Sequence, residues 1–130
     1  MTVTDRAVTW VPVCRADDLT PDRGVAVLVD GRPVAVFLLA ATPTAPATLH
    51  AVDHLDPATG VAVMARGLVG SAANRPYVAS PLHKQRYDLT TGECLDDDSL
   101  CLSVWPVRLV GEVVEVGRDP SRGLPDAEPG

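Results

Sequence analysis

The sequence predicts an all-β domain of short antiparallel strands, arranged as small stacked sheets or a partial barrel. Its apolar residues occur in short, valine-rich runs that Gly, Pro and Asp interrupt, as is usual for strands joined by tight turns. An Asp-Gly pair at residues 30–31 separates two such runs and is the clearest hairpin signal in the chain. No segment repeats its apolar residues every 3.6 positions over several turns, so no long amphipathic helix is expected.

The first half of the chain contains four predicted strands, over residues 10–14, 25–29, 33–39 and 49–53. Residues 16–20 form at most one helical turn. Pro33 stands at the start of the second hairpin strand, and because proline donates no hydrogen bond, this end is expected to be an edge or a strand entry. The stretch 40–48, rich in Ala, Thr and Pro, is predicted to be a connecting loop.

The second half contains five predicted strands, over residues 77–79, 86–89, 93–95, 103–110 and 112–116. Residues 54–76 show little regular pattern and hold five Gly and Pro residues. A structureless stretch of this length in a small domain is often functional. Turns are expected at Thr91-Gly92 and at Gly111, and the alternation in 112–116 predicts a strand with one solvated face.

Length and composition indicate one folded domain. A chain of 130 residues is long enough to bury a core, and 46% apolar residues with intermixed charges argue against disorder. We expect an N-terminal extension at 1–7, the domain at 8–116, and a flexible C-terminal tail at 117–130, which is rich in Gly, Pro and charged residues.

The charge balance excludes some partners. The net charge is −6 and no basic stripe occurs, which disfavours nucleic acid. The run Asp96-Asp97-Asp98 is interpreted as a solvated surface, with a docking patch for a basic partner as the alternative. No apolar run reaches the roughly 20 residues of a membrane span, and no signal peptide is recognisable. We therefore expect a cytoplasmic protein whose three cysteines are reduced thiols.

A metal site is not indicated by the spacing of the available ligands, which are Cys14, Cys94, Cys101, His50, His54 and His83. No Cys-x-x-Cys or Cys-x-His pair occurs, whereas zinc and iron–sulfur sites usually assemble from such pairs. The cysteines are expected to be buried and inert. No metal and no cofactor is therefore expected in this chain.

Catalysis by a nucleophile is also not indicated. Ser80 and His83 are close in sequence, and an aspartate such as Asp56 or Asp88 could orient the imidazole, but proximity in sequence does not establish a triad. No Gly-x-Ser-x-Gly elbow occurs, and the Gly67–Gly70 stretch lacks the features of a phosphate loop. Ser80 is interpreted as a turn residue whose hydroxyl binds a loop amide, and Asp53 and Asp56 as self-capping turn aspartates. We expect no catalytic residue.

Two segments resemble the ligand boxes of a Rieske iron–sulfur domain. Residues 49–53 followed by a loop, and residues 80–83 followed by Tyr-Asp-Leu-Thr-Thr-Gly at 87–92, occur in the order of that family. A Rieske centre takes Cys-x-His from the first loop and Cys-x-x-His from the second. The corresponding positions here are Asp56, Ala58, Ser80 and His83. The resemblance implies a Rieske-like fold of small stacked antiparallel sheets with degenerate cluster positions, because one imidazole cannot hold a cluster.

A more specific resemblance is to the small subunit of assimilatory NAD(P)H-dependent nitrite reductase, over roughly residues 8–116. It is carried by the opening 10–14, by Arg66-Gly67-Leu68-Val69-Gly70, by Ser80-Pro81-Leu82-His83-Lys84-Gln85 and by Thr91-Gly92-Glu93-Cys94-Leu95-Asp96-Asp97. The lengthened stretch 40–48 departs from the pattern. The resemblance implies a non-catalytic partner of a large subunit, which would carry FAD, siroheme and an iron–sulfur centre and reduce nitrite to ammonium in nitrate assimilation.

The two former ligand loops, 53–60 and 80–86, would meet at one tip of a Rieske-like fold. His83, Lys84, Gln85 and Arg86 are the candidate interface residues, with ordinary exposed charges beside a strand as the alternative. Two other functions stay open at this point. One is a 2Fe-2S electron-transfer protein with unconventional ligands, and the other is a cluster-less Rieske-like component of a dioxygenase system.

Overall fold

The computed structural model describes residues 9–118, and they form ten short strands and two single-turn 3-10 helices. The predicted all-β class and the small antiparallel sheets are confirmed. The elements are β1 (Trp10–Arg15), η1 (Ala16–Asp18), β2 (Gly24–Val29), β3 (Arg32–Leu39), β4 (Thr48–Asp53), η2 (Met64–Arg66), β5 (Leu68–Ala72), β6 (Arg75–Ala79), β7 (Arg86–Asp88), β8 (Val104–Trp105), β9 (Val107–Val110) and β10 (Val113–Gly117). They build three sheets, ordered β1-β10-β9, β2-β3-β4-β8 and β5-β6-β7.

The central sheet begins with the predicted hairpin. Asp30 and Gly31 both have positive φ, 52° and 82°, which is the backbone of a type I′ turn. The turn fixes the antiparallel register in which Val29 pairs with Arg32 and Leu28 with Pro33. Pro33 is the second residue of β3, so its expected place at a strand entry is confirmed.

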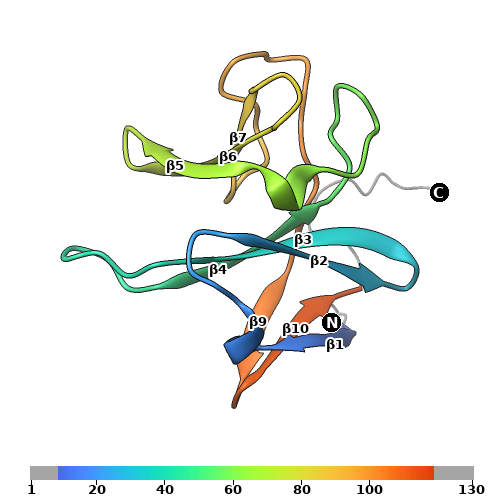
Figure 1. Ribbon diagram of the computed structural model, residues 1–130, viewed down its shortest axis with the longest axis vertical. Helices are drawn as coiled ribbons and strands as arrows, with labels where there is room; N and C mark the ends of the chain where they lie inside the picture. The colour runs from blue at the N-terminus through green and yellow to red at the C-terminus, as the bar shows by residue number, and fades with distance from the viewer. Residues whose placement is uncertain (1–8, 119–130) are drawn as a thin grey trace, which may run out of the picture.

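The central sheet lies between the other two sheets, as Figure 1 shows. Residues of β3 alternate between two separate cores because successive side chains of a strand point to opposite faces. Ala35 and Phe37 belong to the core shared with the β5-β6-β7 sheet. Val34 and Val36 belong to the core shared with the β1-β10-β9 sheet. All four side chains are fully buried, which explains the continuous apolar run of this strand.

The C-terminal strands differ from the prediction in one respect. The expected strand 103–110 is divided at Pro106 into β8, which pairs with β4, and β9, which pairs with β10. Proline cannot donate to a ladder, and the break lets the chain leave one sheet and enter another. The alternation expected for β10 is confirmed, because Val114 and Val116 are fully buried.

The largest error concerns residues 54–76, which were expected to lack regular structure. They contain η2, all of β5 and the start of β6. A tight turn at Ala73 and Asn74, with φ of 52° and 67°, joins β5 to β6. The small residues of β5 have weak strand preferences, so its conformation is decided by pairing with β6. The expected strand 93–95 is replaced by two isolated bridges, in which Glu93 pairs with Cys101 and Cys94 pairs with Tyr87.

The expected extension at 1–7 and residues 119–130 of the expected tail lie outside the described residues, whereas Gly117 still belongs to β10. Within 9–118 no helix is long and apolar enough to cross a membrane. The three cysteines are free, but the expected burial is wrong for Cys101, which is exposed. Cys94 is buried and Cys14 is half-buried.

Candidate functional site

The loop after β4 and the loop after β6 meet through one buried hydrogen bond. The Ser80 hydroxyl donates to Oδ2 of Asp56 over 2.5 Å. Both residues are almost completely buried, with relative exposures of 1% and 0%. The resemblance predicts these two positions for the thiolates of a Rieske centre. A carboxylate and a hydroxyl thus join the loops directly.

The Asp56 loop is organised around that residue. Its backbone carbonyl accepts the amides of Thr59 and Gly60, and its own amide donates to the carbonyl of Val61. Its second carboxylate oxygen, Oδ1, accepts the amide of Ala58 over 2.8 Å. The predicted self-capping role is therefore confirmed for Asp56, and both of its oxygens have donors.

The same prediction is wrong for Asp53. Its carboxylate accepts the indole N–H of Trp105 over 2.8 Å, and the guanidinium of Arg32 lies 4.0 Å away. The indole comes from a strand 52 residues further along the chain. Spacing along the sequence does not reveal such a long-range partner.

The Ser80 loop is a tight turn that is closed by hydrogen bonds of both backbone groups of Ser80. Its amide donates to the carbonyl of Gln85, and its carbonyl accepts the amide of Lys84, each over 2.9 Å. Lys84 has φ of 65°, which closes the turn. The hydroxyl of Ser80 also accepts the amide of Leu82 over 3.2 Å, which confirms the predicted turn role. The bond to Asp56 was not predicted.

The four candidate interface residues differ in their availability to a partner. His83 and Lys84 are exposed, and among the described residues their side chains form no hydrogen bond or ion pair. Arg86 donates through its Nε and one terminal nitrogen to Asp96, over 3.1 and 2.8 Å, and packs over the ring of Tyr77. Gln85 is half-buried. The structure thus leaves two of the four side chains free to bind another molecule.

Exposed apolar side chains lie on both loops. Leu55 and Val61 belong to the first loop and Leu82 to the second, and each is between 41% and 46% exposed. Because the Asp56–Ser80 bond holds the two loops together, these side chains occupy the same end of the domain as His83 and Lys84. This end, formed by residues 54–63 and 80–85, is called the tip below.

Two buried polar atoms, Oε1 of Gln85 in the tip and the Tyr87 hydroxyl just after it in the chain, have no hydrogen-bond partner among residues 9–118. Sequence reasoning did not identify them, because nothing local distinguishes Tyr87 from an ordinary strand residue. Burial raises the pKa of the Tyr87 phenol, and the nearby Asp56 carboxylate raises it further. The phenol therefore stays neutral at physiological pH.

His54 supports the first loop from within. Its Nδ1 accepts the amide of Ala65 over 3.1 Å, and its carbonyl accepts the amides of Val63 and Met64. Burial lowers the pKa of His54, and the positive charge of Arg66 lowers it further. Burial likewise lowers the pKa of His50, the other histidine of this region. The hydrogen bond from the Ala65 amide requires an unprotonated Nδ1 on His54, which a neutral imidazole provides.

The arrangement does not build a hydrolytic site. The Ser80 hydroxyl is engaged by Asp56 and Leu82, and it makes no hydrogen bond to His83. In the part of the chain that the structure describes, no group of three or more His, Cys, Asp or Glu side chains could hold a metal ion.

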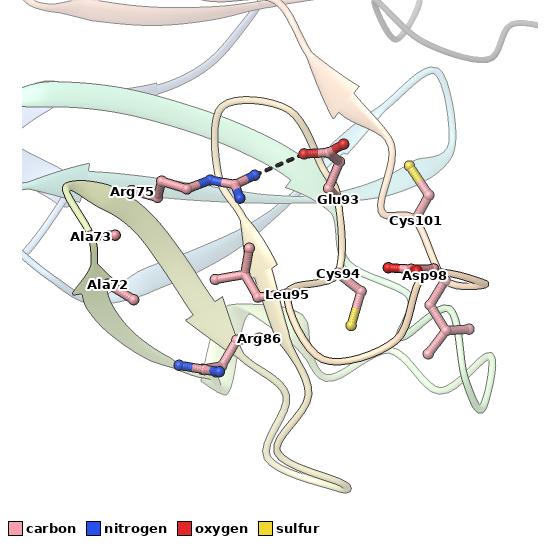
Figure 2. A pocket seen from close by; sticks show the side chains of 10 residues that line it. Ala72, Ala73, Arg75, Arg86, Glu93, Cys94, Leu95, Asp98 and Cys101 are labelled. Carbon is pink, nitrogen blue, oxygen red and sulfur yellow. Dashed lines mark hydrogen bonds and ion pairs between the residues drawn. The ribbon is translucent and has the colours of Figure 1, made fainter.

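A cleft of 690 Å³ lies beside the β5-β6-β7 sheet and is shown in Figure 2. Both arginines that line it form ion pairs. Arg75 pairs with Asp88 and with Glu93, each over 2.7 Å, and Arg86 pairs with Asp96. Cys94 and Cys101 also line it. Glu93 pairs with Cys101 across the two segments, and because neighbouring residues of an extended segment point to opposite sides, the two thiols do not face each other.

The fold defines the class of the protein. A family model described as "Rieske-like [2Fe-2S] domain" matches residues 9–117, and the chain belongs to that family. The family description implies a two-iron cluster, but the residues at the four ligand positions do not fit one. The positions predicted for the thiolates hold Asp56 and Ser80, which bind each other, and Ala58, at a position predicted for a histidine, has no ligand atom in its side chain.

Within this family the chain belongs with the small subunits of nitrite reductase. It is 33% identical over 107 residues to the nitrite reductase (NADH) small subunit of Salmonella typhimurium, covering 82% of this chain and 95% of that one. A solved structure from Mycobacterium tuberculosis, described as an NADH-dependent nitrite reductase small subunit, shares 40% identity at a TM-score of 0.78, with 87% and 97% of the chains covered. The nitrite reductase [NAD(P)H] large subunit of Klebsiella oxytoca contains a segment 32% identical over 108 residues, which covers 83% of this chain and 11% of that protein.

Proposed function

We propose that this chain is the small, non-catalytic subunit of an NAD(P)H-dependent nitrite reductase and acts by binding the large subunit. The observation that carries the proposal is the similarity to a segment of the Klebsiella large subunit. A domain that is separate in one organism and continuous with the large subunit in another is expected to work at that subunit's surface. The FAD, siroheme and iron–sulfur centre that reduce nitrite to ammonium would then belong to the large subunit.

The buried Asp56–Ser80 bond supports a subunit that works without its own cluster. In a Rieske centre the metal joins the two loops, whereas here a carboxylate and a hydroxyl join them. The loops therefore need no metal to hold their shape. We expect the purified chain to contain no iron and to show no visible absorption, with a Rieske ferredoxin from the same host as the control. Stoichiometric iron would overturn this part of the proposal.

We propose the tip as a contact surface for the large subunit. Exposed apolar side chains bordered by polar ones, here His83 and Lys84, are typical of a protein–protein contact surface. His83 and Lys84 would donate hydrogen bonds to an acidic or carbonyl-rich partner, while Arg86 would hold the loop through Asp96. Gln85 would support the turn, since its backbone carbonyl accepts the amide of Ser80. An NAD(P)H-linked reductase of this kind would work in the cytoplasm, in nitrate assimilation.

The test is binding of this chain to its cognate large subunit, with nitrite-dependent oxidation of NADH measured on the complex. The variant His83→Ala/Lys84→Ala should weaken the complex roughly tenfold. Arg15→Ala, at an exposed ion pair to Glu112 on the β1-β10-β9 sheet, is the matched control. Unchanged binding and turnover in the tip variant would overturn the tip as the contact surface. If the wild-type chain does not bind the large subunit at all, the subunit function itself is wrong.

A further inference from the structure

The described Arg and Lys side chains fall into two groups. Most form ion pairs, as expected for a chain with net charge −6. Within residues 9–118 only three lack an ion pair, namely Arg23, Arg66 and Lys84. Lys84 belongs to the tip. Arg23 and Arg66, which are 43 positions apart in the sequence, line one pocket of 360 Å³ on a different part of the surface, together with Asp22, whose carboxylate accepts the amide of Ala40 over 3.0 Å.

The pocket has a rigid backbone floor. A Cβ at Gly24 would lie 2.4 Å from the carbonyl oxygen of Ala65, and one at Gly67 would lie 2.5 Å from the carbonyl oxygen of Ala79. The start of β2, η2 and the end of β6 therefore touch through their backbones. This close packing holds the two arginine-bearing segments at a fixed separation, although both guanidinium groups are exposed.

The pocket opens onto the free edge of a sheet. In the order β5-β6-β7, β5 has a paired strand on one side only. Natural edge strands usually carry a charged residue or a proline that discourages further pairing. The sequence of β5, Leu-Val-Gly-Ser-Ala, has neither. Leu68, its first residue, also lines the pocket and is 76% exposed, more than any other large hydrophobic side chain among the described residues.

We propose that the free edge of β5, together with Arg23 and Arg66, is a docking site for an extended acidic segment of the large subunit. The segment would add to the sheet as a fourth strand through backbone hydrogen bonds, which is the mode called β-augmentation. Its carboxylates would pair with the two free guanidinium groups, and an apolar side chain would cover Leu68. This inference rests on the proposed function and adds a second contact to the tip.

The proposed docking site on β5 and the tip lie next to each other. Leu68 pairs with Ala79, the residue directly before Ser80, so the pocket end of β5 lies beside the start of the second tip loop. One partner can therefore cover both surfaces. An acidic segment suits this edge in particular, because the other arginines of the described surface already form ion pairs, and the remaining unpaired cation, Lys84, lies on the adjoining tip.

Hydrogen exchange measured by mass spectrometry on the complex tests the pairing directly. The amides of residues 68–72 that do not bind β6 should exchange quickly in the free chain and at least tenfold more slowly in the complex. The same peptide should show no protection when the chain alone is concentrated. Protection in the concentrated chain alone would identify a second copy as the occupant and overturn the proposal.

Matched variants test whether the partner segment is acidic. Leu68→Glu/Ser71→Glu should weaken binding to the large subunit roughly tenfold by repelling an acidic segment, whereas Leu68→Gln/Ser71→Gln should weaken it far less. Arg23→Gln/Arg66→Gln should weaken it similarly and reduce its salt dependence, and Arg15→Gln should do neither. Leu109→Glu, at an exposed site on β9, controls for added charge. Circular dichroism establishes that each variant folds.

The outcomes separate the two proposals. If the wild-type complex forms but residues 68–72 remain unprotected, or if the Glu and Gln variants bind alike, the docking site is wrong and the subunit function stands. If no complex forms with the wild-type chain, the subunit function is wrong and this inference falls with it.

Discussion

The Ser80 hydroxyl and the Asp56 carboxylate form a buried hydrogen bond of 2.5 Å that joins two loops 24 residues apart. Neither residue is unusual in its own loop, since each also organises a local turn. Because the two side chains bind each other, one hydrogen bond holds both turns in place. It allows a Rieske-like tip to hold its shape with side chains at the cluster positions.

Loss of this bond should destabilise the domain. Ser80→Ala would leave Oδ2 of Asp56 buried without its donor, at a cost of about 1–3 kcal/mol in the free energy of unfolding. Ser71→Ala, at an exposed serine of β5, should change it by less than about 0.5 kcal/mol. Urea denaturation of both variants gives the comparison. Equal stabilities would mean that the bond contributes nothing to the fold.

Removal of the Tyr87 hydroxyl should have the opposite effect. This oxygen is buried and has no hydrogen-bond partner in the part of the chain that the structure describes, so Tyr87→Phe removes a desolvated polar group and keeps the ring in the core. We expect the free energy of unfolding to rise or to change by less than about 0.5 kcal/mol. Thermal unfolding of Tyr87→Phe and of the wild type, followed by circular dichroism, measures the difference. A loss comparable with that of Ser80→Ala would show that the hydroxyl has a partner in solution.

Stability should fall as the pH drops below about 6.5. Burial lowers the folded-state pKa of His50 and His54, and a positive charge lowers that of His54 further, whereas both would titrate near 6.5 when unfolded. Between the folded and unfolded pKa values the unfolded chain binds more protons than the folded one. The contribution of the two neutral imidazoles to the free energy of unfolding is therefore fully present above the unfolded pKa, and it is lost as the pH falls towards the folded pKa values.

Denaturation midpoints measured between pH 5 and 7.5 test this dependence. His54→Asn retains an acceptor for the Ala65 amide without titrating, so it should flatten the pH profile relative to the wild type. A profile as steep as that of the wild type would exclude His54 as a source of the effect. The aspartates with lowered pKa, such as Asp96, titrate well below this window.

Two glycines with the same backbone angle should respond differently to a methyl group. Gly31 and Gly92 have φ of 82° and 83°, but a Cβ at Gly31 meets open space, whereas one at Gly92 would lie 1.9 Å from the carbonyl oxygen of Leu102. Gly31→Ala should cost about 1 kcal/mol, the price of a left-handed non-glycine residue. Gly92→Ala should cost roughly 3 kcal/mol or more because the backbone itself must move. Similar losses in urea denaturation would contradict the packing at Gly92.

Local sequence signals predicted the elements whose conformation depends on neighbouring residues. The Asp30-Gly31 pair predicted the first hairpin because both positions must accept positive φ. The valine alternation predicted the buried face of β10. The same signals failed for β5, whose small residues have no strong preference of their own and become a strand only against β6. Pro106 was visible in the sequence, but that it separates two sheets was not.

The sequence by itself determined the all-β class and the resemblance to a Rieske-like domain, because these depend on residue type and order along the chain; that its cluster-ligand positions are substituted stays a prediction. Only the tertiary structure decided what those residues do. In it Asp56 binds Ser80, Arg86 forms an ion pair with Asp96, and the side chains of His83, Lys84, Arg23 and Arg66 have no ion pair within residues 9–118. Such choices depend on which groups the folded chain brings within hydrogen-bonding distance, and separation along the sequence does not reveal that distance.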